Sequence, residues 1–382
     1  MSRAYFHFAT MLAAAVLTFN LLSIDRAAAQ SDASQSGAAQ GSGQEMGSAS
    51  LCGAYHDDFL IGVAIDFTQI NPLRPRELQI IKQNFNIVTP ENSMKPQSIE
   101  PEENQWRWGM ADTLVNFCQS NGIQISGHCL VWHNQTPDWF FQGDNGQPAT
   151  RDQVIERMRD HIETEVGHFK GKMKGWDVVN EAIADSGSGD TENLRQTRWL
   201  KAIGPDYIEL AFKFAHEADP GAELYYNDYN IERGAKHQSS MLLLKRLIQD
   251  GVAITAVGIQ GHWSLNYLPF DDIDQAISDY QSLGLKVNIS ELDIAIEGKG
   301  GGQLTQSGGG ASGRPTADQL DAQAKAYAKL FHLFQKHKGT IERVTFWGLN
   351  DSRSWRRGQA ALLLDGDNKP KPAYWAVIAA KE

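Results

Sequence analysis

Two glutamates that close short apolar runs are the residues of this sequence whose types and positions most directly suggest chemistry. Glu181 follows the run at 176–180 (WDVVN), and Glu291 follows the run at 287–290 (VNIS). One carboxylic acid can protonate a leaving oxygen while a second carboxylate attacks or activates water, and glycosidic bond cleavage needs such a pair. Either glutamate alone is more often a loop salt-bridge partner than a catalyst. Because the two are distant in the sequence, only a fold that closes on itself would bring them together.

Polar and aromatic residues also stand at the ends of the other short apolar runs. Sugar rings present flat C–H faces that stack on aromatic side chains, and their hydroxyls need hydrogen bonds from amides, imidazoles and ammonium groups. The residues at these ends include both kinds: Glu91, Asn92, Lys95, His128, Trp132, His133, Gln135, Asn180, Asn227, Asp228, Tyr229, Gln260, His262, Asp293, Trp347 and Trp355. Together with the two glutamates they favour an active site.

Other catalytic chemistries find less support. His128, His133 and His262 could be zinc ligands, but the spacing H-E-x-x-H does not occur, and we interpret them as hydrogen-bonding residues. The G-x-S-x-G elbow of serine hydrolases and the phosphate-binding P-loop are both absent from the sequence. Trp176 and Trp199 are interpreted as packing residues. We therefore expect no metal and no cofactor.

Short apolar or β-branched runs alternate with longer stretches of helical period from residue 59 onward. Eight runs are predicted as strands, at 60–66, 87–91, 124–132, 175–180, 223–227, 256–261, 286–292 and 343–349. The intervening helices are predicted at 74–84, 111–121, 151–169, 197–217, 235–250, 271–283, 316–336 and 373–380. This alternation is typical of parallel strands joined by crossover helices, and eight pairs fit a (β/α)8 TIM barrel.

The barrel also explains where the polar residues stand. The carboxyl ends of barrel strands converge on one face, and active sites are built there, so a barrel would bring Glu181 and Glu291 together. An open doubly wound sheet would need a glycine-rich turn after its first strand, and the segment 65–68 (IDFT) is not one.

Helix ends carry recognisable signals. In 111–121, Leu114, Val115 and Cys118 fall on one apolar stripe with Phe117, and Gly122 is a suitable left-handed stop. Thr316 is expected to cap the next-to-last helix, with Asp318 in its first turn.

Composition indicates a globular protein and excludes several partners. The chain has 382 residues, 41% of them hydrophobic, with ten Trp and a net charge of −11. An acidic chain is repelled by phosphate backbones and anionic lipid surfaces, so we expect no nucleic acid and no membrane partner. Three cysteines, Cys52, Cys118 and Cys129, exclude a disulfide scaffold. Free thiols are favoured, although Cys118 and Cys129 could face each other.

The N-terminal region is interpreted as a targeting and linking segment. Residues 1–29 combine Arg3, an apolar run and a closing AAA, as a secretory signal peptide does. Residues 30–50 are rich in Gly, Ser and Gln and are predicted as a disordered linker, leaving 51–382 as the catalytic domain. We expect an exported monomer, secreted or periplasmic. A second Gly-rich tract lies at 298–313, and its G-x-G-x-x-G match is attributed to chance.

Seven segments, in order along the chain, resemble those of glycoside hydrolase family 10, the endo-1,4-β-xylanases. They are TPENSMKP (89–96), GHCLVWHNQTPDWF (127–140), WDVVNEAI (176–183), YYNDYNIE (225–232), GIQGHW (258–263), ISELDI (289–294) and FWGLNDSRSW (346–355). The resemblance covers roughly 55–380, and the Gly-rich tract at 298–313 looks like an insertion relative to the family pattern.

The resemblance implies a role for each residue that matches the family pattern. Glu181 would be the acid/base and Glu291 the nucleophile of a retaining reaction, with His262 and Asp293 orienting Glu291. Asn180 would hydrogen-bond the sugar 2-hydroxyl, and the indole of Trp355 would exclude the C6 hydroxymethyl of a hexose. The substrate-binding set comprises Glu91, Asn92, Lys95, His128, Trp132, Gln135, Asn180, Tyr229, Gln260, His262, Trp347 and Trp355.

Two alternatives stay open beside an endo-xylanase. A retaining β-1,4-glucanase shares the acid and nucleophile, but Asn92, Lys95 and Trp355 argue against it. A non-catalytic xylan-binding or xylanase-inhibiting barrel would be signalled by the loss of a carboxylate, and both glutamates are present.

Overall fold

The computed structural model describes residues 50–72, 74–143, 146–296 and 314–381. The predicted signal peptide (1–29), residues 30–49 of the predicted linker and the Gly-rich tract (298–313) lie outside these ranges. Ser50, the last residue of the predicted linker, is described and caps a short helix by accepting a hydrogen bond from the Gly53 N–H.

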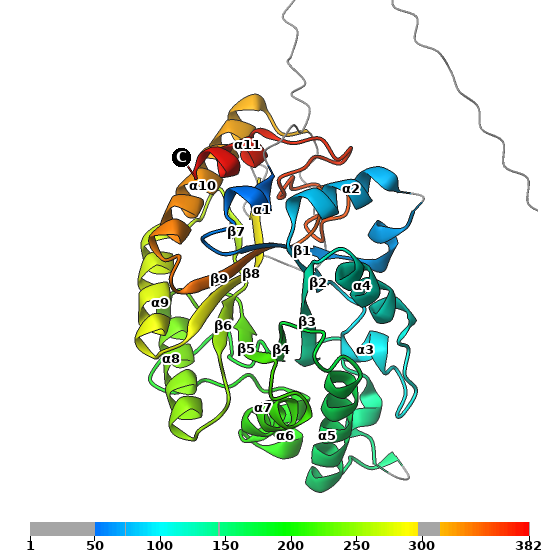
Figure 1. The fold of residues 1–382 in the computed structure, drawn as a ribbon. Helices are drawn as coiled ribbons and strands as arrows, with labels where there is room; N and C mark the ends of the chain where they lie inside the picture. The colour runs from blue at the N-terminus through cyan, green and yellow to red at the C-terminus, as the bar shows by residue number, and fades with distance from the viewer. Residues whose placement is uncertain (1–49, 73, 144–145, 297–313, 382) are drawn as a thin grey trace, which may run out of the picture. The chain divides into compact units, whose positions relative to one another are not determined.

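Parallel strands close into a barrel whose arrows form a ring in Figure 1. Neighbours follow chain order from β1 to β6, then β8 and β9, and the ring is closed by parallel pairing of β9 with β1 and of β6 with β8. The strands described are β1 (Leu60–Ile65), β2 (Ile87–Pro90), β3 (Gln124–Val131), β4 (Gly175–Asn180), β5 (Glu223–Asp228), β6 (Ala256–Ile259), β7 (His262–Ser264), β8 (Lys286–Ala295) and β9 (Ile341–Phe346). The predicted (β/α)8 barrel is confirmed.

One strand, β7, was not predicted. It spans His262–Ser264 and pairs in parallel with the far end of β8, where His262 stands opposite Asp293. The pairing lengthens β8 to Ala295, beyond the predicted end at Leu292. Three residues are too few for a periodic pattern, so the sequence carried no signal for β7.

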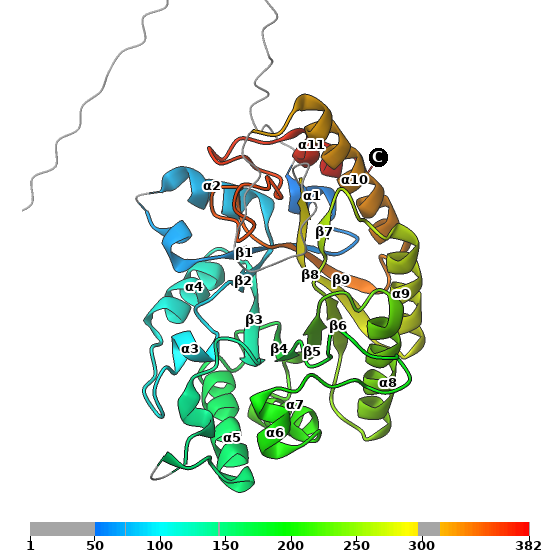
Figure 2. The same cartoon turned by 180° about the vertical axis from the view of Figure 1, so that it is seen from behind.

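Helices surround the ring on its outer side in both views (Figures 1 and 2). The α-helices described are α1 (Leu51–Ala54), α2 (Pro75–Asn84), α3 (Pro96–Ile99), α4 (Gly109–Ser120), α5 (Arg151–His168), α6 (Arg198–Ile203), α7 (Tyr207–Ala218), α8 (Gly234–Gln249), α9 (Phe270–Ser282), α10 (Ala317–Lys336) and α11 (Pro372–Ala379). Short 3-10 turns occur at Phe67–Ile70 and Asp138–Phe141.

The prediction of one continuous helix over 197–217 was wrong, because the chain forms two helices there, α6 and α7. Gly204 ends α6 with φ +107°, a conformation that glycine adopts without steric cost. Pro205 follows and has no N–H to continue the helical hydrogen bonding. The helical periodicity on either side concealed this break.

Predicted caps and packing residues are confirmed where the structure describes them. Thr316 caps α10 by accepting from the Gln319 N–H, with Asp318 in the first turn. Gly122, just beyond α4, has φ +66°. Trp176 and Trp199 are buried in the core, and Cys52, Cys118 and Cys129 are free thiols. Among the described helices, none is both long and apolar enough to cross a lipid bilayer.

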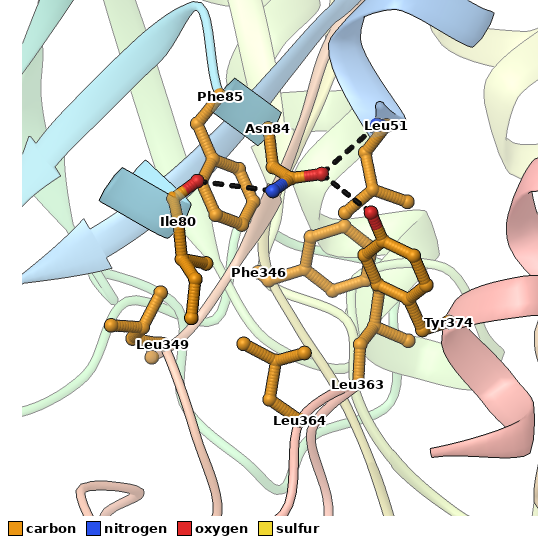
Figure 3. Close-up of a pocket in the computed structure, with 10 residues that line it drawn as sticks. Leu51, Ile80, Asn84, Phe85, Phe346, Leu349, Leu363, Leu364 and Tyr374 are labelled. Carbon is orange, nitrogen blue, oxygen red and sulfur yellow. Dashed lines mark hydrogen bonds between the residues drawn. The ribbon is translucent and has the colours of Figure 1, made fainter. Parts of the chain in front are cut away.

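A buried amide joins the two ends of the barrel domain (Figure 3). The Asn84 side chain accepts from the Leu51 N–H (3.3 Å) and the Tyr374 hydroxyl (2.7 Å) and donates to the Ile80 carbonyl (3.1 Å). Apolar side chains, including Phe85 and Phe346, surround it and leave a cavity of only about 10 Å³. A space of this size holds about one water molecule, so this pocket is structural rather than a ligand site.

Candidate active site

A cleft of about 800 Å³ opens at the carboxyl ends of the barrel strands. This volume is typical of small-molecule sites. Its walls bring together the predicted Glu91, Asn92, Lys95, His128, Trp132, Gln135, Asn180, Glu181, Tyr229, Gln260, His262, Glu291, Trp347 and Trp355. Asp293 is fully buried behind the wall and contacts His262. His133, Asn134, Arg195, Asn230, Gly261, Trp263 and Arg357 complete the lining.

Gln260 connects the two glutamates. Its side-chain amide donates to Glu181 Oε1 (3.1 Å), while its main-chain carbonyl accepts from the Glu291 N–H (2.8 Å). Glu181 follows the end of β4 and Glu291 lies within β8, so barrel closure gathers groups that are remote in the sequence. The two carboxylates therefore face one site.

Glu291 is surrounded by groups that favour its ionised form. Asn227 donates to Oε1 (2.8 Å), and His262 Nε2 lies 3.0 Å from Oε2. Burial alone would raise the pKa of Glu291, but the hydrogen bond from His262, the neighbouring charges of His128 and His262, and the Asn227 bond hold it below its usual value. An ionised, unprotonated Glu291 is what a nucleophile requires.

His262 sits between two carboxylates. Its Nδ1 lies 2.9 Å from Asp293 Oδ2 and its Nε2 faces Glu291. Burial would lower the pKa of His262, yet Asp293 and Glu291 outweigh it and raise the pKa to about 9. The imidazolium therefore carries a positive charge against Glu291 at neutral pH.

Asp293 is itself held by two residues of the loop after β9. The Trp355 indole donates to Oδ2 (2.9 Å), and the Arg356 guanidinium pairs with Oδ1 at 2.7 Å. Trp355 thus has an exposed ring on the cleft and an anchored N–H behind it. The chain of contacts from Arg356 through Asp293 and His262 fixes the orientation of Glu291.

Glu181 has an environment that favours its protonated form. Trp132 donates to Oε2 (2.9 Å) and Gln260 to Oε1, both of which stabilise the anion. Burial and the negative charge of Asp228, with a smaller contribution from Glu291, nevertheless raise the pKa of Glu181 above its usual value. A neutral carboxylic acid at this position can donate a proton.

His133 adds no positive charge beside Glu181. Its Nδ1 lies 3.9 Å from Glu181 Oε2, but burial and the nearby Arg195 lower the pKa of His133 to about 4. At neutral pH the imidazole is uncharged, so it does not hold Glu181 in the anionic form. The sequence analysis interpreted this residue as a hydrogen-bonding histidine and gave it no part in setting the charge of Glu181.

Asn227 is a site residue that the sequence analysis left unassigned. Ser290 donates to its Oδ1 (2.6 Å), which turns the amide nitrogen toward Glu291. Gly258 makes room for this arrangement, because a Cβ there would lie 2.3 Å from Asn227 Oδ1. The amides of Asn180 and Asn227 lie 2.9 Å apart, so Asn227 also supports Asn180. The only sequence signal was its place at the end of a strand.

The remaining polar residues line one side of the cleft beside aromatic rings. Lys95 donates to Asn92 (3.1 Å) and lies 5.1 Å from the ring centre of Trp132. His128 Nδ1 lies 2.9 Å from buried Asp177, which fixes the imidazole edge-on to Trp347. Burial is the main reason that the pKa of Glu91 is raised to about 7, with Lys95 opposing it. These donors, acceptors and rings suit a polyhydroxylated ligand.

Across the described ranges, no cluster of three or more His, Cys, Asp or Glu side chains has the arrangement of a metal site. Of the three cleft histidines predicted as hydrogen-bonding residues, His128 and His262 are confirmed, because each binds a buried carboxylate. The prediction was wrong for the Nδ1 of His133, which is buried and has no hydrogen-bond partner among the described residues.

Comparison with known proteins gives one family and a consistent set of relatives. The model of Glycosyl hydrolase family 10 matches residues 50–380. Exoglucanase XynX of Acetivibrio thermocellus is 40% identical over 86% of this chain, which spans 29% of that relative. Beta-1,4-xylanase of Dictyoglomus thermophilum is 38% identical over 86% of this chain, which spans 90% of it.

Solved structures agree with the sequence relatives. The intracellular xylanase TsXylA of Thermoanaerobacterium saccharolyticum is 40% identical and has a TM-score of 0.79, with 87% of this chain and 99% of that chain covered. A further structure of a TsXylA mutant is a complex with xylotriose.

Proposed function

The chain belongs to glycosyl hydrolase family 10, and from this membership and the geometry of its cleft we propose that it is a retaining endo-1,4-β-xylanase. The observation that carries the proposal is that two glutamates of one site have pKa values shifted in opposite directions. The pKa of Glu181 is raised and that of Glu291 is lowered, as an acid and a nucleophile require.

The reaction proceeds by two displacements. Glu291 attacks the anomeric carbon while Glu181 protonates the leaving oxygen, so the glycosidic bond breaks and an ester links the sugar to Glu291. Glu181, now ionised, takes a proton from water, and the water oxygen attacks the same carbon to release Glu291. The anomeric configuration is retained because each displacement inverts it.

Formation of the ester prepares the second step. The negative charge of Glu291 is one of the causes that raise the pKa of Glu181. When Glu291 becomes an ester this charge disappears, and the pKa of Glu181 falls. Glu181 then changes from a proton donor to a base.

The substrate is a β-1,4-xylan. This class is supported by a relative named beta-1,4-xylanase and by the complex of the TsXylA mutant with xylotriose. Asn92, Lys95 and Gln135 would bind hydroxyls, and Asn180 would bind the 2-hydroxyl of the sugar at the reaction centre. The indole of Trp355, anchored to Asp293, would crowd the C6 hydroxymethyl of a glucose unit. Steric discrimination of this kind is limited, so slow cleavage of β-1,4-glucan is expected.

A glucanase is the second candidate, favoured by one relative named an exoglucanase. Product analysis on xylan and on carboxymethyl cellulose in parallel decides between the two. Short xylo-oligosaccharides from xylan, formed first as the β-anomer in NMR spectra, support the proposal. Faster cleavage of the cellulose derivative, or initial formation of the α-anomer, would contradict it.

We also propose that the protein is exported, on the strength of the apolar run and AAA motif within residues 1–29. N-terminal sequencing of the protein recovered from the medium or periplasm of an expressing bacterium tests this. Cleavage before Gln30 is the expected result, and an intact protein retained in the cytoplasm would contradict it.

A further inference from the structure

Glu181 is held in an unusual backbone conformation. Its φ of +59° lies in the left-handed region, which non-glycine residues rarely adopt. Strain of this kind persists only where neighbouring groups fix the backbone. The direction in which the Glu181 carboxyl points therefore depends on the groups that fix the main chain of residues 181–183.

A single residue, Arg195, binds the main-chain carbonyls of that segment. Its Nε donates to the Glu181 carbonyl (3.1 Å) and its Nη2 to the Ile183 carbonyl (3.1 Å). Its main-chain N–H donates to the Ala182 carbonyl (2.7 Å). Three successive carbonyls beginning at Glu181 are thus bound by one residue.

Arg195 is in turn fixed by partners on both sides. Asp185 accepts from both terminal nitrogens (3.1 and 3.2 Å), and Tyr229 accepts from Nη2 (2.9 Å). Lys236 holds Asp185 in place, because its ammonium pairs with Asp185 (3.2 Å) and with buried Asp228 (2.9 Å). The guanidinium is therefore a rigid part of the cleft wall rather than a free surface cation.

We propose that Arg195 is a positioning residue that sets the distance and direction between the Glu181 carboxyl and the leaving oxygen. The proposal rests on the proposed function, because it assigns Arg195 to the acid step of that reaction. A guanidinium offers five N–H donors in one plane, whereas the three donors of a lysine radiate from one atom. A lysine would keep the positive charge at this position, but its single nitrogen could not bind both the Glu181 and the Ile183 carbonyl.

The test compares two aryl β-xylobiosides that differ in their need for acid. Phenol is a poor leaving group and requires protonation, whereas 2,4-dinitrophenol departs without it. For Arg195→Lys in the full chain, kcat/KM on the phenyl glycoside should fall about 100-fold, the scale of a misplaced catalytic group. On the dinitrophenyl glycoside kcat/KM should fall no more than about threefold. This parameter reports only the steps up to departure of the leaving group, and dinitrophenol departs without an acid.

Arg157→Lys is the matched control. Arg157 also binds main-chain carbonyls, those of Trp139 (2.8 Å) and Gln142 (2.7 Å), and it pairs with Glu103, but it is not part of the cleft wall. Loss of a purely structural clamp should change kcat/KM for the two glycosides by the same factor. The ratio of the two values in this variant should equal that of the unmodified protein.

Equal losses on both glycosides in Arg195→Lys would overturn the proposal, and so would an unchanged rate on both. Asp185→Asn gives a second, milder variant that loosens Arg195 without removing it. We expect its phenyl-to-dinitrophenyl ratio to fall about tenfold, and an unchanged ratio would also overturn the proposal. Failure of the unmodified protein to hydrolyse either glycoside would overturn the proposed function itself, and that result is read before any variant is compared.

Discussion

Glu181 and Glu291 are buried to a similar extent, 9% and 5% exposed, yet their pKa values shift in opposite directions. Desolvation acts on both in the same sense. The difference comes from their neighbours: Glu291 faces the imidazolium of His262, whereas Glu181 faces Asp228 and a neutral His133. Burial sets up the site, and the charges placed around each carboxylate decide its task.

The largest effect is expected from removing the nucleophile. Glu291→Ala should lower kcat on xylan by about 10⁴ to 10⁶-fold, the scale seen when a nucleophile is deleted. Initial rates of reducing-sugar release measure this. Glu163→Gln, on the exposed face of α5, is the control and should keep full activity. More than a tenth of normal activity in Glu291→Ala would end its assignment as nucleophile.

Removing the acid should have a smaller and more selective effect. Glu181→Ala should lower kcat/KM on xylan by about 10² to 10⁴-fold, the usual contribution of general acid catalysis. The 2,4-dinitrophenyl β-xylobioside should be largely spared in kcat/KM, because its leaving group needs no proton. Comparable losses on both substrates would show that Glu181 has some other task.

The pH dependence of kcat/KM tests whether Asp293, acting through His262, keeps Glu291 ionised. Asp293→Asn removes the charge that chiefly raises the pKa of His262, so the imidazole becomes neutral at lower pH and stabilises Glu291 less. The pKa of Glu291 should then rise, and the acidic limb of the kcat/KM profile should move up by about one pH unit. An acidic limb that stays in place would separate Asp293 from the ionisation of Glu291.

The smallest effect is expected from replacing Glu165, a buried glutamate outside the cleft, and it concerns stability rather than rate. Burial and the nearby Glu100 raise the pKa of Glu165, so the folded state keeps a proton that the unfolded state loses above about pH 4.5. Stability should therefore decline as pH rises above 4.5. Glu165→Gln should lessen this decline and stabilise the protein by about 1 kcal/mol at neutral pH.

Thermal unfolding at pH 5 and pH 8 measures the effect. Glu163→Gln on the same helix is the control and should unfold with the pH dependence of the unmodified protein. A Glu165→Gln variant that loses stability equally at both pH values would show that the carboxylate is ionised and required.

The sequence predicted the barrel because eight short apolar or β-branched runs alternate with longer stretches of helical period, and this alternation is a clear local signal of parallel strands joined by helices. It mistook α6 and α7 for one helix, since Gly204 and Pro205 interrupt a pattern that is apolar on both sides. It missed β7, which exists only because β8 extends beside it.

The site was predictable to the extent that its residues stand at strand ends. Glu181, Glu291 and His262 fall there and meet because the barrel closes. Arg195 was not predictable, because it lies in a loop and its contacts depend on how residues 181–185 return beside it. Arg356 and Asp177 act from behind the cleft wall, and no local pattern marks a residue as the partner of a catalytic group.

The opposite ionisation of the two glutamates is best tested by measuring both directly. Carboxyl chemical shifts of ¹³C-labelled glutamate, followed by NMR from pH 3 to pH 8, can be assigned with Glu181→Gln and Glu291→Gln variants. We expect the resonance of Glu291 to titrate below the usual pKa of 4.5 and that of Glu181 above it. If Glu291 titrates at the higher pH of the two, the division of labour described for this cleft is wrong.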